Sequence, residues 1–494
     1  MRFRRLRGKK EFMRKTKIVA TMGPATSNPE VMRALILAGL DVARFNFSHA
    51  DYDNVRAHAN MIRSLCKETG RAVGLLADTK GPEIRLGTFE GGKAELAEGS
   101  VFTLTSDTVE GTAAKASISY DGLSRDVTPG TRILIDDGLI ELVVEQVSNS
   151  PTNNAITTRV VNGGVISNRK SLNVPGISLN IPFISAKDRA DLRFFTEVGF
   201  DFIAASFVRC EEDIRHLREE LHRMGGGDIK IISKIENSEG VRNADAILAV
   251  SDGLMVARGD LGVEVEFEEL PILQKDLIKK AYRAGKNVIT ATQMLESMIH
   301  NPRPTRAETS DVANAIYDGT SAVMLSGETA VGKYPVEVVK TMARIAEITE
   351  TDIDYIKRFR LGDYKHETSV TNAISHATVT TAHDLEAAAI LVVSKSGETA
   401  RNVSKFRPLC PIICCTPSPV TLRQLTLAWG ITPLLTQEDT TTADLFTHAV
   451  NTAMQSGHVH AGDLVVLTAG VPVGVSGTTN LLKVHEVGEK ISVF

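Results

Sequence analysis

Polar and charged side chains that could do chemistry follow short apolar runs in the first two thirds of the chain, where strands are expected to end. They are Arg44, Asn46, Ser48 and His49; Asp78, Thr79 and Lys80; Lys234 and Glu236; Arg258 and Asp260; Thr292 and Gln293; and Ser326 and Glu328. The carboxyl ends of parallel strands meet at one mouth of a barrel. Gathering these groups there without a ligand would cost several kcal/mol. We therefore expect a bound ion and an anionic substrate.

Two carboxylates of this set, Glu236 and Asp260, follow neighbouring predicted strands. Carboxylate oxygens are hard donors that suit Mg²⁺ or Mn²⁺, and such an ion would take its other ligands from water and substrate. Zinc is disfavoured, because the sequence lacks pairs of cysteine or histidine at ligand spacing.

A second group of oxygen donors comprises Asn46, Ser48, Asp78 and Thr79. It offers several neutral oxygens and only one carboxylate, which is a poor match to a small divalent ion. A larger monovalent cation fits this mixture better.

Positive charge accompanies these oxygens at Arg44, Lys234 and Arg85. A phosphoryl group in transfer spreads negative charge over its oxygens and is stabilised by such cations. Surface salt bridges are the alternative for each basic residue. Gly259 and Gly262 would let the backbone approach a ligand closely.

A helix is predicted to begin near Thr292. The amide groups of its first turn would point at an anion such as a carboxylate.

The elements that must position these residues are short β-branched runs alternating with helix-period segments. Strands are predicted at residues 17–22, 41–47, 73–78, 202–207, 229–234, 254–258, 288–292 and 322–326. Helices are predicted at 28–39, 55–67, 188–198, 214–224 and 272–284. Eight such strands with helices predict a (β/α)8 TIM barrel of about 250 residues.

Between the third and fourth strands the pattern changes to short strands with Gly and Pro turns, which predicts an inserted all-β domain that could act as a lid. After residue 371, strands near 389–393, 412–415 and 464–468 predict a C-terminal α/β domain, beyond a polar boundary at 354–367. The predicted units are a basic extension at 1–12, the barrel at 13–84 and 187–353, a β-barrel lid at 85–186, and the C-terminal domain at 368–494.

Composition excludes several classes of protein. The chain has 494 residues, a net charge of −4 and 43% hydrophobic residues, which is ordinary globular composition. The weak negative charge gives no reason to expect nucleic acid as the main partner, and no apolar run is long enough to predict a membrane span. Five cysteines without paired spacing predict neither a disulfide framework nor a zinc site. A cytoplasmic protein is expected.

The extension at 1–12 precedes a second methionine, Met13. We treat it as an upstream or non-native segment rather than as a nucleic-acid or membrane arm.

Between Lys17 and Val487 the sequence resembles the pyruvate kinase family. The resemblance rests on TKIVATMGPAT, ARFNFSH, LADTKGPEIR, IISKIEN, VARGDLGVE, ITATQMLESM, NPRPTRAE, DVANAIYDGTSAVMLSGETA and SGTTN. It implies a homotetrameric enzyme that transfers the phosphoryl group of phosphoenolpyruvate to ADP, giving pyruvate and ATP. Its domains would be the barrel, a β lid and a C-terminal regulatory domain.

The resemblance also implies roles for individual residues. Glu236 and Asp260 look like the Mg²⁺ or Mn²⁺ ligands, and Asn46, Ser48, Asp78 and Thr79 look like the K⁺ site. Arg44 and Lys234 correspond to residues that hold and stabilise the phosphoryl group, with Arg85 as a further catalytic candidate, while Arg258, Gly259, Asp260 and Thr292 surround the substrate. Glu83 is similar to the glutamate of K⁺-requiring members. Thr292, Ser326 and Glu328 could organise water that protonates the enolate.

Two departures from the family pattern concern the nucleotide. Ala50 and Ser171 stand where the family usually has glycine, which puts in doubt the fine detail of ADP contacts by His49 and Lys170.

In the C-terminal domain, hydroxyl-rich residues follow a predicted strand and begin a helix, where hydroxyls and amides can hold a phosphate. In the family this segment and a late loop resemble a sugar-phosphate effector pocket, which here comprises Ser394, Lys395, Ser396, Gly397, Thr399, Ser476 and Gly477. An ordinary helix cap is the alternative.

Two other functions were weighed. A carbon-carbon lyase acting on phosphoenolpyruvate or pyruvate would share the metal carboxylates, but it has no use for Arg44 or a monovalent-cation cluster. A phosphosugar sensor that has lost catalysis should lack Lys234, Glu236 or Asp260, and all three are present.

Overall fold

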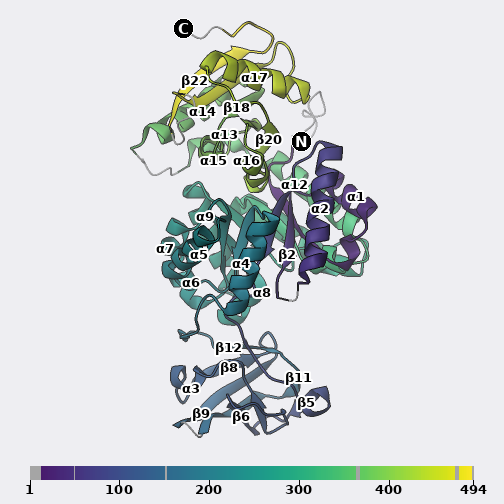
Figure 1. Ribbon diagram of the computed structural model, residues 1–494, viewed down its shortest axis with the longest axis vertical. Helices are drawn as coiled ribbons and strands as arrows, with labels where there is room; N and C mark the ends of the chain where they lie inside the picture. Colours follow the sequence, from purple (N-terminus) through teal and green to yellow (C-terminus); the bar gives the residue numbers. More distant parts are fainter. Residues whose placement is uncertain (1–12, 49, 151–152, 363–367, 473–477, 492–494) are drawn as a thin grey trace.

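The computed structural model describes residues 13–48, 50–150, 153–362, 368–472 and 478–491. Three units lie in a row along the longest axis, with the barrel between the β insert and the C-terminal unit (Figure 1). The predicted extension at 1–12 lies outside the described residues. No helix of the described chain combines the length and apolarity needed to cross a membrane.

The central unit is a closed barrel of eight parallel strands, as the sequence predicts. Their spatial order is β1-β17-β16-β15-β14-β13-β3-β2. The bounds are β1 Lys17–Thr21, β2 Val42–Asn46, β3 Gly74–Asp78, β13 Phe202–Ala205, β14 Lys230–Ile235, β15 Gly253–Ala257, β16 Asn287–Ala291 and β17 Ala322–Leu325. Strands β1, β3 and β15 are buried at every residue, as expected where helices cover the outside and side chains fill the inside.

The barrel helices follow from local capping signals as well as from burial. In α1, the Asn28 side chain accepts a hydrogen bond from the Glu30 amide at 2.7 Å, and Gly39 ends the helix with φ of +108°. The helices are α1 Pro29–Ala38, α2 Tyr52–Thr69, α4 Ala186–Val198, α5 Glu211–Arg223, α6 Ser238–Arg242, α7 Ala244–Val250, α8 Arg258–Glu264, α9 Leu270–Arg283, α10 Arg306–Asp318, α11 Gly327–Ala330 and α12 Pro335–Asp352.

The inserted unit leaves the barrel after β3. Its strands are β4 Ile84–Arg85, β5 Lys93–Leu96, β6 Val101–Thr105, β7 Lys115–Ser117, β8 Arg132–Ile135, β9 Ile140–Ser150, β10 Asn153–Asn162, β11 Gly164–Ser167 and β12 Ser171–Asn173. Seven pair in the order β4-β12-β8-β9-β10-β6-β7, and β11 pairs with β5. The expected β-barrel is therefore not closed by hydrogen bonds among the described strands, and one short helix, α3 Leu123–Asp126, interrupts the all-β pattern.

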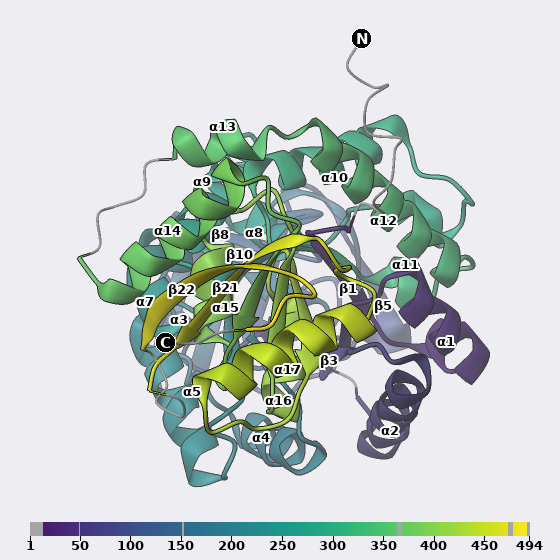
Figure 2. The same ribbon diagram turned by 90° about the horizontal axis from the view of Figure 1, so that it is seen from above.

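The C-terminal unit is a five-stranded sheet in the order β20-β19-β18-β21-β22. The strands are β18 Ala389–Val393, β19 Ile412–Thr416, β20 Ile431–Leu435, β21 Leu464–Gly470 and the antiparallel β22 Thr479–Glu486. Alternate residues of β18 pack on opposite faces, Ile390 with helix α14 Val370–Asp384 and Leu391 with helix α17 Thr442–Gln455. The two helices therefore flank the sheet (Figure 2).

The polar stretch at 354–367 is not a simple linker. Helix α13 occupies Tyr355–Arg360, and its Phe359 packs into the core of the C-terminal unit. Tyr355 and Phe359 are buried. The polar composition of the stretch gave no indication that these two aromatic side chains pack into the protein.

One residue of the C-terminal unit enters the barrel itself. Leu427 is fully buried in the cluster that fills the barrel interior, beside Val19 and Phe202. Arg423 also pairs with the buried Asp201 at 2.8 Å. The C-terminal unit therefore closes the amino-terminal end of the barrel.

We expect Leu427→Ala to lower the free energy of unfolding by about 2–5 kcal/mol, since it opens a cavity in a packed interior. Leu435→Ala is the matched control, because Leu435 is 52% exposed, and it should change stability little. Denaturant unfolding measures both. Equal stability of the two variants would contradict the packing role of Leu427.

Candidate active site

An ion-pair cluster occupies the carboxyl ends of β2, β3 and β14. Arg44 Nε lies 2.7 Å from Asp78 Oδ2, and Lys234 Nζ lies 3.1 Å from Asp78 Oδ1. Burial alone would raise the pKa of Asp78, but the positive charges of Arg44 and Lys234 outweigh it and hold the pKa below its usual value. This carboxylate therefore aligns the two cations, which supports their expected place beside a phosphoryl group.

Lys234 also touches the first predicted metal ligand. Its Nζ lies 2.8 Å from Glu236 Oε1. Burial alone would lower the pKa of Lys234, but the surrounding carboxylates, chiefly Asp78 and Glu236, outweigh burial and raise it. The ammonium is held in its charged form, as charge stabilisation requires.

Glu236 is fully buried and fits a divalent cation. Its Oε2 accepts a hydrogen bond from the Phe207 amide at 2.7 Å. Its Oε1 is close to Lys234 but at an angle that makes no hydrogen bond, and it accepts none from any other described residue. Burial raises the pKa of Glu236 to about 8, with the negative charge of Asp260 adding to the effect. A buried carboxylate oxygen without a hydrogen bond is a natural cation ligand.

Asp260 lies in the first turn of α8, directly after β15. It is close enough for its charge to raise the pKa values of both Lys234 and Glu236. The structure therefore gathers the two predicted metal carboxylates with Lys234. Among the described residues, no group of three or more acidic, histidine or cysteine side chains could hold a metal. A divalent ion at the pair would thus need ligands from water or substrate.

The predicted monovalent-cation residues lie at the adjoining strand ends. Asn46 and Asp78 are direct partners in the register of β2 and β3. The Asn46 Oδ1 accepts from the Ser48 amide at 3.1 Å, and the Thr79 hydroxyl accepts from the Ser206 amide at 3.1 Å. All four supply oxygen donors with a single carboxylate, which is chemistry that suits a large monovalent cation.

The predicted helix at Thr292 is wrong. Thr292 and Gln293 have φ of +69° and +54°, and the next helical turn is a 3-10 turn at Glu296–Ile299. The positive φ values turn the chain, so no helix begins at Thr292. Instead the Thr292 hydroxyl accepts from the Gly259 amide at 2.9 Å and donates to the Ala291 carbonyl at 2.7 Å.

Arg258 does not present a free guanidinium to a substrate. It pairs with Asp311 at 2.6 Å and donates to the carbonyl oxygens of Ala291 at 3.2 Å and Thr292 at 2.5 Å. Its side chain therefore braces the loop that carries Thr292. No local signal in the sequence joins Arg258 to Asp311, 53 residues later.

Glu328 is likewise engaged with backbone. It is fully buried and accepts from the amides of Ser326 at 2.6 Å and Leu295 at 3.1 Å. Burial raises its pKa. The carboxylate therefore joins the loop after β16, at Leu295, to the loop after β17, at Ser326.

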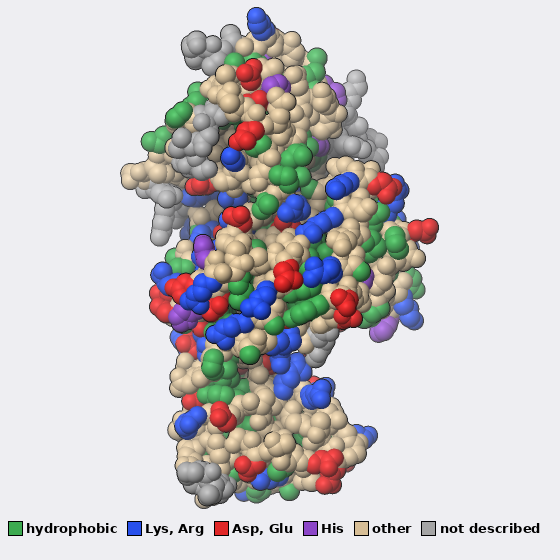
Figure 3. Space-filling model, in the orientation of Figure 1, with side chains coloured by type: hydrophobic (Ala, Val, Ile, Leu, Met, Phe, Trp, Pro, Cys, Tyr) green, Lys and Arg blue, Asp and Glu red, His purple; other side chains and the backbone are tan. Residues whose placement is uncertain are grey.

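Arg85, predicted to act on the phosphoryl group, and Lys170, predicted to contact the nucleotide, lie at the junction with the insert. Arg85 Nε pairs with Glu83 at 2.8 Å and its Nη1 donates to the Arg169 carbonyl at 2.9 Å. Lys170 pairs with Asp136 at 2.8 Å. The molecule narrows at this junction (Figure 3), where a cleft of about 70 Å³ is lined by both units and reaches Asp260. His49 lies outside the described residues.

Sequence reasoning missed Ser206. Its hydroxyl accepts from Lys234 Nζ at 2.8 Å and donates to the Thr79 carbonyl at 2.7 Å, with Asp78 Oδ1 as an alternative acceptor at 3.1 Å. Ser206 directly follows β13, so it belongs to the polar residues at the strand ends. It was missed because the predicted strand extended to residue 207 and included Ser206.

In the C-terminal unit, Gly397 begins α15 Glu398–Ser404 with φ of +75°. The Thr399 hydroxyl lies 2.7 Å from that of Thr479, which joins the turn after β18 to β22. Lys395 pairs with Glu438 at 2.7 Å. Ser476 and Gly477 fall outside the described residues.

A TIM barrel whose strand ends hold paired carboxylates, a buried lysine and an arginine presents the charges that a phosphoryl-transferring enzyme uses. The chain matches the family models described as "Pyruvate kinase, barrel domain" over residues 13–339 and "Pyruvate kinase, alpha/beta domain" over 372–485.

Named relatives agree with these matches. The chain is 50% identical to a pyruvate kinase of Bacillus licheniformis over 97% of this chain and 82% of that protein. It is 48% identical to one of Clostridium acetobutylicum over 96% of this chain and 100% of that protein. A crystal structure of a pyruvate kinase from Cryptosporidium parvum superposes with a TM-score of 0.90 at 40% identity, covering 96% of both chains. The chain belongs to the pyruvate kinase family. It transfers the phosphoryl group of phosphoenolpyruvate to ADP and needs a divalent metal.

Proposed function

We propose that Glu236 and Asp260 hold Mg²⁺, or Mn²⁺ in its place, while Asn46, Ser48, Asp78 and Thr79 hold K⁺. The observation that carries the metal assignment is the buried Glu236 Oε1 without a hydrogen bond. The divalent ion would neutralise phosphoryl oxygens and orient the substrate. Glu83, paired with Arg85 beside the insert, supports K⁺ dependence by its likeness to K⁺-requiring members.

The chain's own residues then act on the transferring group. Lys234 and Arg44, fixed by Asp78, stabilise the negative charge that spreads over the phosphoryl oxygens as ADP attacks in line. Ser206 positions the Lys234 ammonium. Arg85, at the junction with the insert, would add positive charge beside the phosphoryl group, and Lys170 would contact ADP together with His49.

Loss of the phosphoryl group leaves an enolate, which takes a proton to become pyruvate. Thr292 and Ser326 lie on loops that Glu328 and Arg258 brace, and their hydroxyls would orient the water that delivers this proton. Neither hydroxyl is acidic enough to act as a simple general acid. The backbone at Gly259, bonded to Thr292, borders the three-carbon part.

The experiment for this assignment is steady-state turnover of phosphoenolpyruvate and ADP, with Mg²⁺ and K⁺ varied separately. Replacing K⁺ by tetramethylammonium at constant ionic strength should lower turnover many-fold. Unchanged turnover without K⁺ would remove the monovalent-cation site.

We also propose that a sugar phosphate activates the enzyme at Ser394, Ser396, Gly397 and Thr399, with Lys395 and the loop at Ser476 and Gly477. The Thr399–Thr479 contact supports this, because it couples the turn after β18 to the strand that follows the late loop.

We expect Thr399→Ala to blunt activation by a panel of sugar phosphates while sparing maximal turnover at saturating substrate. Removal of the hydroxyl takes away one hydrogen bond to a phosphate without touching the barrel. Thr447→Ala, an exposed threonine on α17, is the matched control. Unchanged activation in Thr399→Ala would remove the effector assignment.

The enzyme is proposed to act in the cytoplasm as a homotetramer. All five cysteines are free, which suits a reducing compartment. Phe267, shortly before α9, and Ile272, in its first turn, are 79% and 69% exposed. Such residues are available for contact with another copy. Light scattering should give four times the 53.4 kDa mass of one chain.

A further inference from the structure

The side chains of the barrel strands alternate between the barrel interior and the surrounding helices. Val19 on β1 and Val42 on β2 pack in the cluster that fills the interior, whereas the residues that follow them pack against the helices. The residues two positions after each valine therefore face the interior again, at the carboxyl ends of the strands. They are Thr21 and Arg44, which are direct partners in the parallel register of the two strands.

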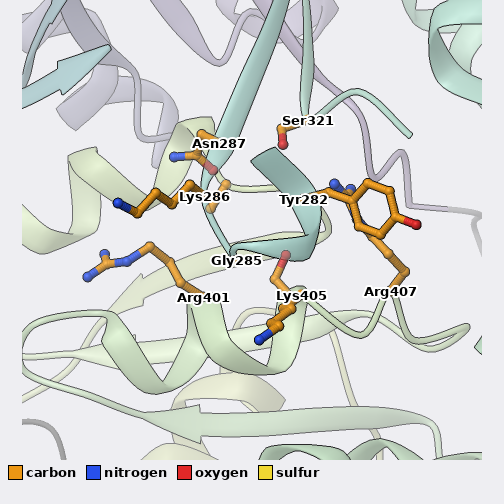
Figure 4. A pocket seen from close by; sticks show the side chains of 10 residues that line it. Tyr282, Gly285, Lys286, Asn287, Ser321, Arg401, Lys405 and Arg407 are labelled. Atoms are coloured by element: carbon orange, nitrogen blue, oxygen red, sulfur yellow. The ribbon is translucent and has the colours of Figure 1, made fainter. Parts of the chain in front are cut away.

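This layer of side chains is reached from the mouth that holds the candidate active site. Leu427 fills the interior at the other end of the barrel. The pocket next to it, lined by Ala428, Lys286 and Arg401 among others, measures about 10 Å³, which is room for about one water molecule (Figure 4). A substrate therefore approaches Thr21 and its neighbours from the carboxyl ends of the strands.

The hydroxyl of Thr21 connects β1 to both of its neighbouring strands. It donates to the Leu325 carbonyl of β17 at 2.9 Å and accepts from Arg44 Nη1 of β2 at 2.8 Å. A hydroxyl has one hydrogen to donate, so the bond to Leu325 leaves the oxygen lone pairs for the guanidinium. Thr21 is buried, and its own carbonyl accepts from the Thr329 hydroxyl at 2.9 Å. The acceptor for Arg44 therefore has a fixed position and direction.

Arg44 is anchored from the strands on both sides of β2. Asp78 of β3 accepts from its Nε at 2.7 Å, and Thr21 of β1 accepts from its Nη1. A planar guanidinium held at one nitrogen can pivot about that bond, whereas anchors on two nitrogens fix its plane. In the part of the chain that the structure describes, the other N–H groups of Arg44 have no acceptor. They remain available to a phosphoryl group.

The Thr21 hydroxyl aligns Arg44 without offsetting its charge. Asp78 already shares its carboxylate between Arg44 and Lys234. A second carboxylate in the place of Thr21 would offset the positive charge that a phosphoryl group in transfer requires. A neutral acceptor supplies the second anchor and leaves that charge intact.

We propose that Thr21 is a positioning residue for phosphoryl transfer, which holds the Arg44 guanidinium in the orientation that receives the phosphoryl oxygens. Thr21 acts through Arg44 rather than on the reacting atoms. Donors that are already oriented stabilise a transition state strongly, because they need no reorganisation as the charge develops. A guanidinium free to pivot is therefore a weaker catalyst. The inference rests on the role proposed for Arg44 and extends it to a second residue.

The test is a double-mutant cycle on kcat/KM for phosphoenolpyruvate, with ADP, Mg²⁺ and K⁺ saturating. Thr21→Val removes the hydroxyl and keeps the branched shape. It should lower kcat/KM at least about tenfold, the factor that one hydrogen bond to a charged group represents. In an Arg44→Met background, assayed at higher enzyme concentration, Thr21→Val should have almost no further effect. Thr21→Ser keeps the hydroxyl and should recover most of the wild-type kcat/KM.

Thr158→Val is the matched control. Thr158 is fully buried in β10, and its hydroxyl donates to the Phe102 carbonyl of the neighbouring strand at 2.7 Å, as that of Thr21 does to Leu325. Its loss should lower the melting temperature but leave kcat/KM at the wild-type value. If Thr21→Val does not fold, Thr21→Ala replaces it in the cycle, because alanine brings no methyl group toward Arg44.

The cycle separates failure of this inference from failure of the proposed function. Unchanged kcat/KM in Thr21→Val, with Arg44→Met impaired, would overturn the role of Thr21 and leave that of Arg44. An equal loss in the wild-type and Arg44→Met backgrounds would show a structural role only, and would overturn the inference as well. Wild-type kcat/KM in Arg44→Met would remove the role proposed for Arg44 and the inference with it.

Discussion

Lys234→Met should lower turnover by about 10³-fold, because it removes a buried positive charge aimed at the phosphoryl group in the transition state. The ammonium lies 3.1 Å from Asp78 and 2.8 Å from Glu236, and the side chain of Lys234 is only 11% exposed. Charge stabilisation in such a place is far stronger than in water. The Michaelis constant for phosphoenolpyruvate should change much less than turnover, since the charge acts mainly on the transition state.

Loss of Lys234 also leaves two carboxylates facing each other, so stability must be measured beside activity. Lys67→Met, an exposed lysine on α2, is the matched control and should keep full turnover. Mn²⁺ binding to Lys234→Met should persist, because Glu236 and Asp260 remain. A folded Lys234→Met enzyme with wild-type turnover would refute the role of this lysine.

Glu236→Gln should weaken Mn²⁺ binding at least about 100-fold, the upper end of what loss of an outer-shell partner costs. Turnover at ordinary Mg²⁺ should collapse with it, and excess metal should restore part of the activity. The amide keeps the shape of the carboxyl and can still accept from the Phe207 amide. Because burial raises the pKa of Glu236, a neutral side chain is tolerated here, and the melting temperature without metal should move little.

Electron paramagnetic resonance of free Mn²⁺ measures this affinity directly. Glu268→Gln is the matched control, since Glu268 is exposed and lies beyond the end of α8. Equal Mn²⁺ affinity of the Glu236→Gln and Glu268→Gln enzymes would show that the divalent ion binds elsewhere.

The barrel could be predicted from the sequence because each of its strands has a recognisable local sequence pattern. Burial on both faces of a parallel strand leaves a short β-branched run, as in Val288 to Ala291, and polar residues mark where it ends. The rule that the carboxyl ends of barrel strands meet at one mouth was enough to predict that five residues lie together there: Arg44, Asp78, Lys234, Glu236 and Asp260. The structure brings these five together.

The rest depended on contacts that the chain makes over long distances. The pairing of Arg258 with Asp311, 53 residues later, has no local signal in the sequence. Thr292 reads as a helix start, because nothing local signals a positive φ at a β-branched residue. Short α6 and α7 escaped prediction, since segments of five and seven residues carry too few turns to show a helical period.

The fit of the C-terminal unit on the barrel could not be read from composition either. Leu427 is part of the C-terminal unit in sequence, but its side chain packs in the interior of the barrel. The nearby Arg423 forms a hydrogen bond with Asp201, which lies 222 residues earlier in the chain. Only the folded chain shows that these two residues lie at the floor of the barrel.

The most direct test of the account is the rate of pyruvate and ATP formation from phosphoenolpyruvate and ADP by the wild-type, Lys234→Met and Lys67→Met enzymes, with Mg²⁺ and K⁺ present or withheld. We predict that wild type and Lys67→Met require both cations and turn over alike, and that Lys234→Met is about 10³-fold slower with both present. Full turnover by Lys234→Met, or turnover by wild type without a divalent ion, would contradict the assignment of catalysis to this barrel mouth.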